Sequence, residues 1–258
     1  MNKIFFKSTD GIKLCGVWHL PKAPTNKAII LAHGITANKD ESGVFVALAE
    51  LLKDNGFAVF RFDFRGSGES GGKSVDLTIQ GEIDDITAAI NEVKSSGYTQ
   101  IGLLGASFGG GASILYSSKQ QEQIKCLCLW NPVLNYDHCF LHATTDWVKD
   151  KVGHMRQDFE EKGWTTLGSA KYIIGKQLFD EMEPLFPYKE LKKINIPIVI
   201  LHGTKDKHVP YEDSREYIKG VGELVTIDGA AHGFHEKGVI QEKAFQSTLE
   251  FFKKNLQV

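Results

Sequence analysis

The sequence has no long apolar segment and no block of basic residues. Near its start only residues 4–6 form an apolar run, far short of a signal-peptide core or of the ~20 residues in a membrane helix. Charged residues make up 24% of the chain, and its formal net charge is −2 at pH 7. We therefore expect a cytoplasmic globular protein without a membrane span or a nucleic-acid partner, since nucleic-acid binding requires a basic surface.

Cysteine is scarce, and its spacing does not suggest a metal site. No CxxC pair occurs among the four cysteines, which are Cys15, Cys126, Cys128 and Cys139. The pair at 126 and 128 lies in an apolar run, where alternate side chains of a strand share one face. We expect buried thiols. Because an HExxH motif is also absent, we expect neither a metal nor a cofactor.

Apolar strand patterns alternate with helical patterns along most of the chain. Segments 3–8 and 12–20 flank an Asp-Gly turn and predict an antiparallel hairpin. A continuous apolar run at 28–32 and further strand patterns at 57–62, 101–104, 126–130, 196–201 and 224–227 follow, with helical patterns at 41–55, 79–93, 112–118 and 245–252. Repeated strand and helix units predict an α/β fold whose sheet has about eight mostly parallel strands covered by helices on both faces.

One interval, between Pro132 and Pro187, breaks this alternation. It shows no clear strand, is rich in aromatic residues, and is much longer than an ordinary connection. We expect an inserted helical cap at 132–187 on a core domain formed by 1–131 and 188–258. The aromatic residues favour a hydrophobic or aromatic ligand, although they equally suit the cap's own core. Candidate pocket residues are Trp147, Trp164 and Phe234.

The motif GASFG at 105–109 stands directly between a predicted strand and a predicted helix. At such a sharp turn a serine hydroxyl is exposed, and the flanking glycines remove side chains that would collide with neighbouring backbone. Out of context, the motif fits an ordinary glycine-rich turn equally well. The strand, turn and helix together favour Ser107 as a nucleophile.

A nucleophilic serine requires a base and an acid, and suitable residues for both follow in the chain. Asp206 comes after the strand at 196–201, and His232 comes after the strand at 224–227. Taken alone, each also fits a structural role. The order Ser107, Asp206, His232, with all three at the carboxyl edge of a parallel sheet, predicts a catalytic triad.

Other histidines and two backbone amides also belong to this prediction. His208 and His235 are rivals for the base, but the first lies beside the predicted acid and the second farther along its loop. His202, at the end of its strand, is expected to bond locally. The predicted oxyanion donors are the backbone N–H groups of Ile35, in the HGIT loop at 33–36, and of Phe108; a plain strand-ending turn fits that loop equally well.

The segment GSGESG at 66–71 matches GxGxxG and offers an alternative function, dinucleotide binding. Its glycines continue into position 72 instead of opening a helix, and the next acidic residues, Asp84 and Asp85, lie in a helical pattern. Both observations disfavour a dinucleotide site.

Together the motifs resemble the α/β-hydrolase superfamily. HGIT, FDFRGSGES at 62–70, GASFGG, HGTKDKHVP and GAAHGF occur in the family's order over nearly the whole chain. The likeness is to small bacterial cinnamoyl or feruloyl esterases and to the serine aminopeptidase and monoglyceride-lipase-like group. This resemblance implies the triad Ser107, Asp206 and His232, the oxyanion amides of Ile35 and Phe108, and an insertion that shapes the substrate pocket.

The sequence therefore predicts a serine carboxylesterase that cleaves small to medium hydrophobic or aromatic esters through an acyl-enzyme. On the same triad, the alternatives are a peptidase, a thioesterase, a C–C bond hydrolase, or a lysophospholipase or monoacylglycerol lipase. A further alternative is a non-catalytic binding module that has kept the fold. The oligomeric state is left open.

Overall fold

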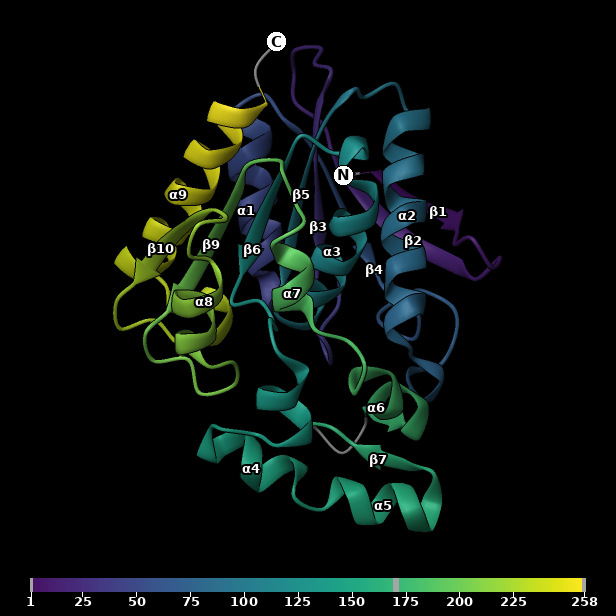
Figure 1. The fold of residues 1–258 in the computed structure, drawn as a ribbon. Coiled ribbons are helices and arrows are strands. Elements are labelled where there is room, and N and C mark those ends of the chain that lie inside the picture. The colour runs from purple at the N-terminus through teal and green to yellow at the C-terminus, as the bar shows by residue number, and fades with distance from the viewer. Residues whose placement is uncertain (1, 169–171, 257–258) are drawn as a thin grey trace.

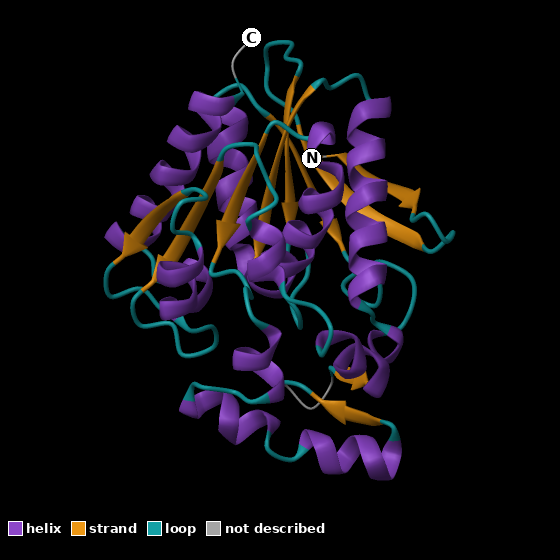
Figure 2. Ribbon diagram, viewed as in Figure 1, coloured by secondary structure: helices purple, strands orange, loops and turns teal. Residues whose placement is uncertain are grey.

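An eight-stranded sheet forms the centre of the computed structural model, which describes residues 2–168 and 172–256 (Figure 1, Figure 2). Its strand order is β1-β2-β4-β3-β5-β6-β9-β10. The strands are β1 (Asn2–Lys7), β2 (Lys13–His19), β3 (Lys27–Ala32), β4 (Ala58–Asp63), β5 (Gln100–Ala106), β6 (Cys126–Trp130), β9 (Ile198–Gly203) and β10 (Glu223–Ile227). The β1–β2 and β2–β4 pairs are antiparallel and all others parallel. The predicted hairpin and mostly parallel sheet are confirmed.

Helices cover both faces of this sheet. The helices α1 (Val44–Asp54) and α9 (Val239–Asn255) pack on one face, and α2 (Ile79–Ser95) and α3 (Ser107–Gln120) pack on the other. Successive side chains of β3 point to opposite faces of the sheet. Ile29 packs in the core beneath α1 and α9, and Ile30 packs in the core beneath α2 and α3. Because both faces are buried, such strands are continuously apolar.

The parallel strands end at one edge of the sheet, the lower edge in Figure 2. The loops that leave this edge hold η1 (Glu41–Gly43), after β3, and η5 (His232–Phe234), after β10. Other short helices are η2 (Ser74–Asp76), η3 (Gln121–Gln123), α7 (Pro187–Leu191) and α8 (Tyr211–Tyr217). Parallel topology thus brings chain segments far apart in sequence to one edge.

Most of the interval 132–187 lies beyond this edge (Figure 1). It contains the π-helical η4 (Asp137–Leu141), α4 (Asp146–Val152), α5 (Met155–Lys162), β7 (Trp164–Thr166), β8 (Ile173–Gly175) and α6 (Lys176–Met182). The expectation of no strand here was wrong, because β7 and β8 pair antiparallel. Three-residue strands are too short to show an alternating pattern. The cap and its boundaries stay a prediction.

Three further findings bear on the sequence expectations. The helix expected from residue 41 begins instead at Val44, because Glu41 and Ser42 adopt positive φ angles. All four cysteines are buried and free, as expected. No helix among residues 2–168 and 172–256 has the length and apolar character needed to cross a membrane.

Candidate active site

Ser107 lies at the junction between β5 and α3 with a φ angle of 52°, a left-handed backbone conformation. The glycines around it allow close packing of the turn. A Cβ atom on Gly109 would lie 2.2 Å from the carbonyl oxygen of His33, and one on Gly105 would lie 2.4 Å from Ser113 Oγ. Close packing therefore explains the glycines at positions 105 and 109 of the motif. The turn leaves Ser107 in the lining of a pocket.

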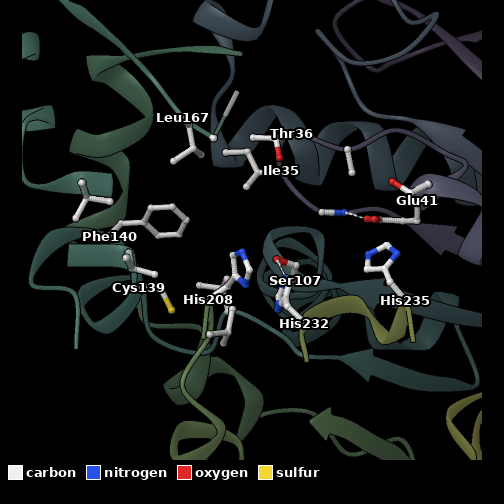
Figure 3. A pocket seen from close by; sticks show the side chains of 18 residues that line it. Ile35, Thr36, Glu41, Ser107, Cys139, Phe140, Leu167, His208, His232 and His235 are labelled. Carbon is white, nitrogen blue, oxygen red and sulfur yellow. Dashed lines mark hydrogen bonds between the residues drawn. The ribbon is translucent and has the colours of Figure 1, made fainter. Parts of the chain in front are cut away.

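A continuous hydrogen-bond chain connects the three residues of the predicted triad. Ser107 Oγ lies 2.9 Å from His232 Nε2, and His232 Nδ1 lies 2.7 Å from Asp206 Oδ2. The residues come from three loops at the carboxyl edge, after β5, β10 and β9. Figure 3 shows the serine and histidine side chains facing one another.

The side chain of Asp206 is buried and receives several donors. Its Oδ1 accepts the backbone N–H groups of His208, at 2.8 Å, and Val209, at 3.0 Å. Its Oδ2 accepts the Asn131 side-chain amide at 2.8 Å and lies 3.2 Å from His202 Nε2. Asn131 was not predicted to belong to the site, because no sequence motif marks it. His202 does bond locally, but next to the predicted acid.

These contacts set the charges of the acid and the base. Burial alone raises the pKa of Asp206, but the charge of His232 and the hydrogen bonds from His202 and His232 outweigh it and lower that pKa. Burial lowers the pKa of His232, but the charge and hydrogen bond of Asp206 prevail and raise it above 6.5. The two shifts favour a protonated His232 ring beside an ionised Asp206 carboxylate.

His33 shapes the loop that carries the first predicted oxyanion donor. Its Nε2 accepts the Phe64 N–H at 3.0 Å, so its Nδ1 carries the proton and donates to the Gly34 carbonyl oxygen at 2.8 Å. Burial lowers the pKa of His33 and favours this neutral form. The loop runs against Ser107, since a Cβ on Gly34 would lie 2.9 Å from Ser107 Cβ.

The two predicted oxyanion amides are Ile35 and Phe108. Phe108 is the second residue of α3, where backbone N–H groups have no acceptor within the helix and the helix dipole favours negative charge. For the Ile35 N–H, the described residues supply no hydrogen-bond acceptor. Both amides are thus available to an incoming oxygen, as stabilisation of an oxyanion requires.

A pocket of about 380 Å³ opens beside Ser107. Figure 3 shows apolar side chains on one side of the serine, including Phe140 and Leu167, and Glu41 and His235 on the other. The other apolar lining residues are Ile35, Ala37, Val133, Cys139, Val148, Val152 and Val209. The pocket therefore has an apolar side formed mainly by the interval 132–187 and a polar side formed by the core.

The aromatic residues proposed for the pocket need correction. Trp164 is 39% exposed, and Phe234 is fully buried with its ring 5.1 Å from that of Trp130; neither belongs to the described pocket lining. The side chain of Trp147 lies outside the described part of the structure. An aromatic residue in a sequence carries no signal of the direction in which it points, so Phe140 was not singled out.

The rival histidines also lie near the triad. The ring of His208 is centred 4.9 Å from that of His232, and its Nδ1 lies 3.9 Å from Asp206 Oδ1. His235 lines the pocket. Among these histidines, His232 is the one whose Nε2 accepts the hydrogen bond from the Ser107 hydroxyl, which makes it the geometric match for a general base.

Two groups of potential metal ligands occur in the described residues. Asp206 and His232 form one with His208, but these two already bond to each other. The other group combines Cys15, Asp63 and Glu69. There the Lys39 ammonium lies 2.8 Å from the Asp63 carboxylate and 3.0 Å from the Glu69 carboxylate. In that group a lysine already supplies the positive charge that a metal would bring.

The sheet order, the serine at the turn after β5, and the loops after β9 and β10 define an α/β-hydrolase. A family model described as Serine aminopeptidase, S33, matches residues 23–171. The chain belongs to this family of hydrolases. Because the matched region ends before residue 206, the positions of the acid and the base rest on the geometry.

Individual relatives extend over nearly the whole chain. A 31.7 kDa Escherichia coli protein from the traX-finO intergenic region is 32% identical, over 97% of this chain and 98% of its own. An acyl transferase of Shewanella hanedai is 25% identical, over 92% of this chain and 79% of its own. Among solved structures, Est1E from Butyrivibrio proteoclasticus with bound ferulic acid superposes on this protein with a TM-score of 0.82. The superposition covers 98% of each chain, and the two sequences are 25% identical.

Proposed function

We propose that this protein is a serine hydrolase that cleaves esters of apolar carboxylic acids, with Ser107 as nucleophile, His232 as general base and Asp206 as orienting acid. The observation that carries the proposal is the hydrogen-bond chain of 2.9 and 2.7 Å through these residues. The lowered pKa of Asp206 and the raised pKa of His232 support the same roles.

The reaction proceeds in two steps. Ser107 gives its proton to His232 as its oxygen bonds to the ester carbonyl carbon, and the amides of Ile35 and Phe108 hold the resulting oxyanion. His232 then protonates the departing alcohol, which leaves an acyl-serine. In the second step water attacks while His232 takes its proton, and the return of that proton to the Ser107 oxygen releases the acid.

The pocket supports an apolar acyl group of modest size. Its volume of about 380 Å³ lies near the lower end of small-molecule sites. The side chains of Phe140 and Leu167 favour an apolar or aromatic group on that side of Ser107. The ferulic acid complex of Est1E is consistent with such a ligand.

A panel of p-nitrophenyl and alkyl esters, graded separately in acyl and alcohol size, tests this proposal. The wild type should hydrolyse short and aromatic acyl esters, and Ser107→Ala should lose about 10⁶-fold in kcat because the triad acts as a unit. Circular dichroism should show an unchanged fold. Retention of most of the activity by Ser107→Ala would contradict the assignment.

Acyl transfer to an acceptor other than water is a second candidate, favoured by the several curated relatives named acyl transferases. An acyl-serine can be attacked by an alcohol as well as by water. The same panel, run with glycerol or methanol present, separates the two: a transferase forms the new ester in excess over free acid. Amide and thioester substrates added to the panel test the peptidase and thioesterase alternatives.

A further inference from the structure

Glu41 approaches the nucleophile from a turn with three consecutive left-handed residues. The φ angles of Glu41, Ser42 and Gly43 are 43, 53 and 94°, and only glycine adopts such angles readily. Asp40 fixes the turn: its carbonyl accepts the Gly43 N–H at 2.8 Å, and its carboxylate accepts a hydrogen bond from the Arg61 guanidinium. The fold thus maintains a conformation that two side chains disfavour, as is common at functional sites.

The turn places the Glu41 carboxylate against the loop of the first predicted oxyanion donor. Its Oε1 accepts the Gly34 N–H at 2.6 Å, a bond drawn in Figure 3. On the other side, Gly34 touches the nucleophile so closely that a Cβ would lie 2.9 Å from Ser107 Cβ. Gly34 is thus held between the carboxylate and the nucleophile, and the next N–H along the chain is that of Ile35.

Glu41 also carries a charge that no cation neutralises within the described part of the chain. Its carboxylate lines the pocket beside Ser107. Burial lowers the pKa of His232, whereas the charge of Asp206 and, to a smaller extent, that of Glu41 raise it. The groups around His232 come from four segments and are Glu41, Ser107, Asp206 with His208, and His235.

We propose that Glu41 is a positioning residue: it holds Gly34, and with it the Ile35 N–H, beside the forming oxyanion, and its charge stabilises protonated His232. This inference rests on the proposed serine mechanism. It explains why a glutamate occupies a strained position where glycine would be less strained. It also accounts for the unneutralised carboxylate, because a salt bridge would weaken its field at the base.

Two variants separate position from charge. Glu41→Gln keeps an acceptor for the Gly34 N–H but removes the charge, whereas Glu41→Gly removes both and relieves the positive φ. Glu212→Gln is a matched control, because the Glu212 side chain is 64% exposed and pairs with Arg215 on α8. The readouts are kcat and KM for a p-nitrophenyl ester, the pH profile of kcat/KM, and the melting temperature.

For Glu41→Gly we expect kcat to fall about tenfold to hundredfold, as expected for a misplaced donor, with KM changed less than about threefold. Its melting temperature should equal or exceed that of the wild type. Glu41→Gln should recover much of the kcat at high pH, while its acid limb moves to lower pH because His232 loses a stabilising charge. The control should match the wild type throughout.

Wild-type kcat in Glu41→Gly, or an unchanged acid limb in Glu41→Gln, would overturn the inference. The pH profile of Glu41→Gln still tests the inference if the Glu41→Gly variant does not fold. Labelling of Ser107 by a fluorophosphonate in the wild type reports on the serine mechanism separately. If the wild type is labelled and the variants behave as the wild type, only the role of Glu41 fails; if Ser107 is not labelled, both proposals fail.

Discussion

Asp206 keeps its charge in a buried position because donors surround it. Two backbone N–H groups, the Asn131 amide and the His232 ring are all within 3.0 Å of its oxygens. These bonds offset the loss of hydration, which would otherwise favour the neutral acid. The carboxylate also bonds to His232 Nδ1, which leaves the ring with Nε2 toward Ser107. In the proposed mechanism Asp206 would therefore act through geometry and charge together.

Replacing Asp206 by Asn should preserve the shape of the site but remove its charge. We expect kcat to fall by about 10⁴, because an amide favours the wrong histidine tautomer. The wild-type acid limb of kcat/KM should lie above pH 6.5, since His232 must be neutral to act and its pKa is raised. In Asp206→Asn that limb should move to lower pH.

Steady-state rates between pH 5 and 9 measure both effects. Asp54→Asn is the control, because the Asp54 side chain is 71% exposed at the end of α1 and should leave the profile unchanged. A wild-type acid limb well below 6.5, or Asp206→Asn activity close to that of the wild type, would show that Asp206 does not hold the base.

The sequence allowed the three residues of the triad to be predicted because backbone topology alone decides their meeting place. Each of Ser107, Asp206 and His232 follows a strand, and parallel strands end at one edge. By contrast, the contacts of Asn131 and Glu41 depend on positive φ angles, 44 and 43°. No periodicity indicates such angles in residues other than glycine, so these contacts became visible only in three dimensions.

At the scale of elements, the turn between β5 and α3 depends on the contact of α3 with the loop after β3. The carbonyl oxygen of His33 occupies the space that a side chain on Gly109 would need. Because both segments carry predicted oxyanion donors, their close approach sets the separation of the Ile35 and Phe108 amides. Packing of the elements and geometry of the site are thus coupled.

Gly109→Ala should therefore damage activity as well as stability. Its Cβ would meet His33 backbone at 2.2 Å, so the loop must shift, and a displacement near 1 Å can lower kcat about 100-fold. Gly97→Ala is the matched control: its Cβ enters open space, and its positive φ of 94° costs only stability, about 1–2 kcal/mol.

Chemical denaturation and kcat, measured on both variants, check this contrast. If both variants lose the same stability and Gly109→Ala keeps the wild-type kcat, the β5–α3 turn tolerates movement of the loop and the prediction is wrong.

The interval 132–187 allows no such sharp prediction from its sequence. Its short elements bury aromatic rings against each other, as Phe159 and Phe179 do at 5.1 Å, and this leaves little sequence signal for a pocket.

At the scale of the whole molecule, the central strands of the sheet are covered on both faces and are mostly apolar, so their composition indicates strands but not the strand order. About eight strands could be recognised from the sequence, and their alternation with helical patterns indicated the mostly parallel sheet. The side on which each helix packs follows from three-dimensional contacts. For the same reason Phe140 and Leu167, which line the apolar side of the pocket, were not predicted.

Burial also determines the behaviour of the four thiols. Burial raises the pKa of all four cysteines, so little thiolate forms at neutral pH. We expect none to react with Ellman's reagent within minutes in the native protein and all four to react in guanidinium without a reductant. Rapid reaction of the native protein would contradict the packing, and fewer than four thiols after unfolding would indicate a disulfide.

The central claim is that Ser107 is the nucleophile of a serine hydrolase. Its most direct test is incubation with a fluorophosphonate, followed by intact-mass measurement and peptide mapping of the wild type and Ser107→Ala. We predict one added phosphonyl group on Ser107 in the wild type and none in the variant. Absence of labelling in an active wild type, or labelling of another residue, would contradict it.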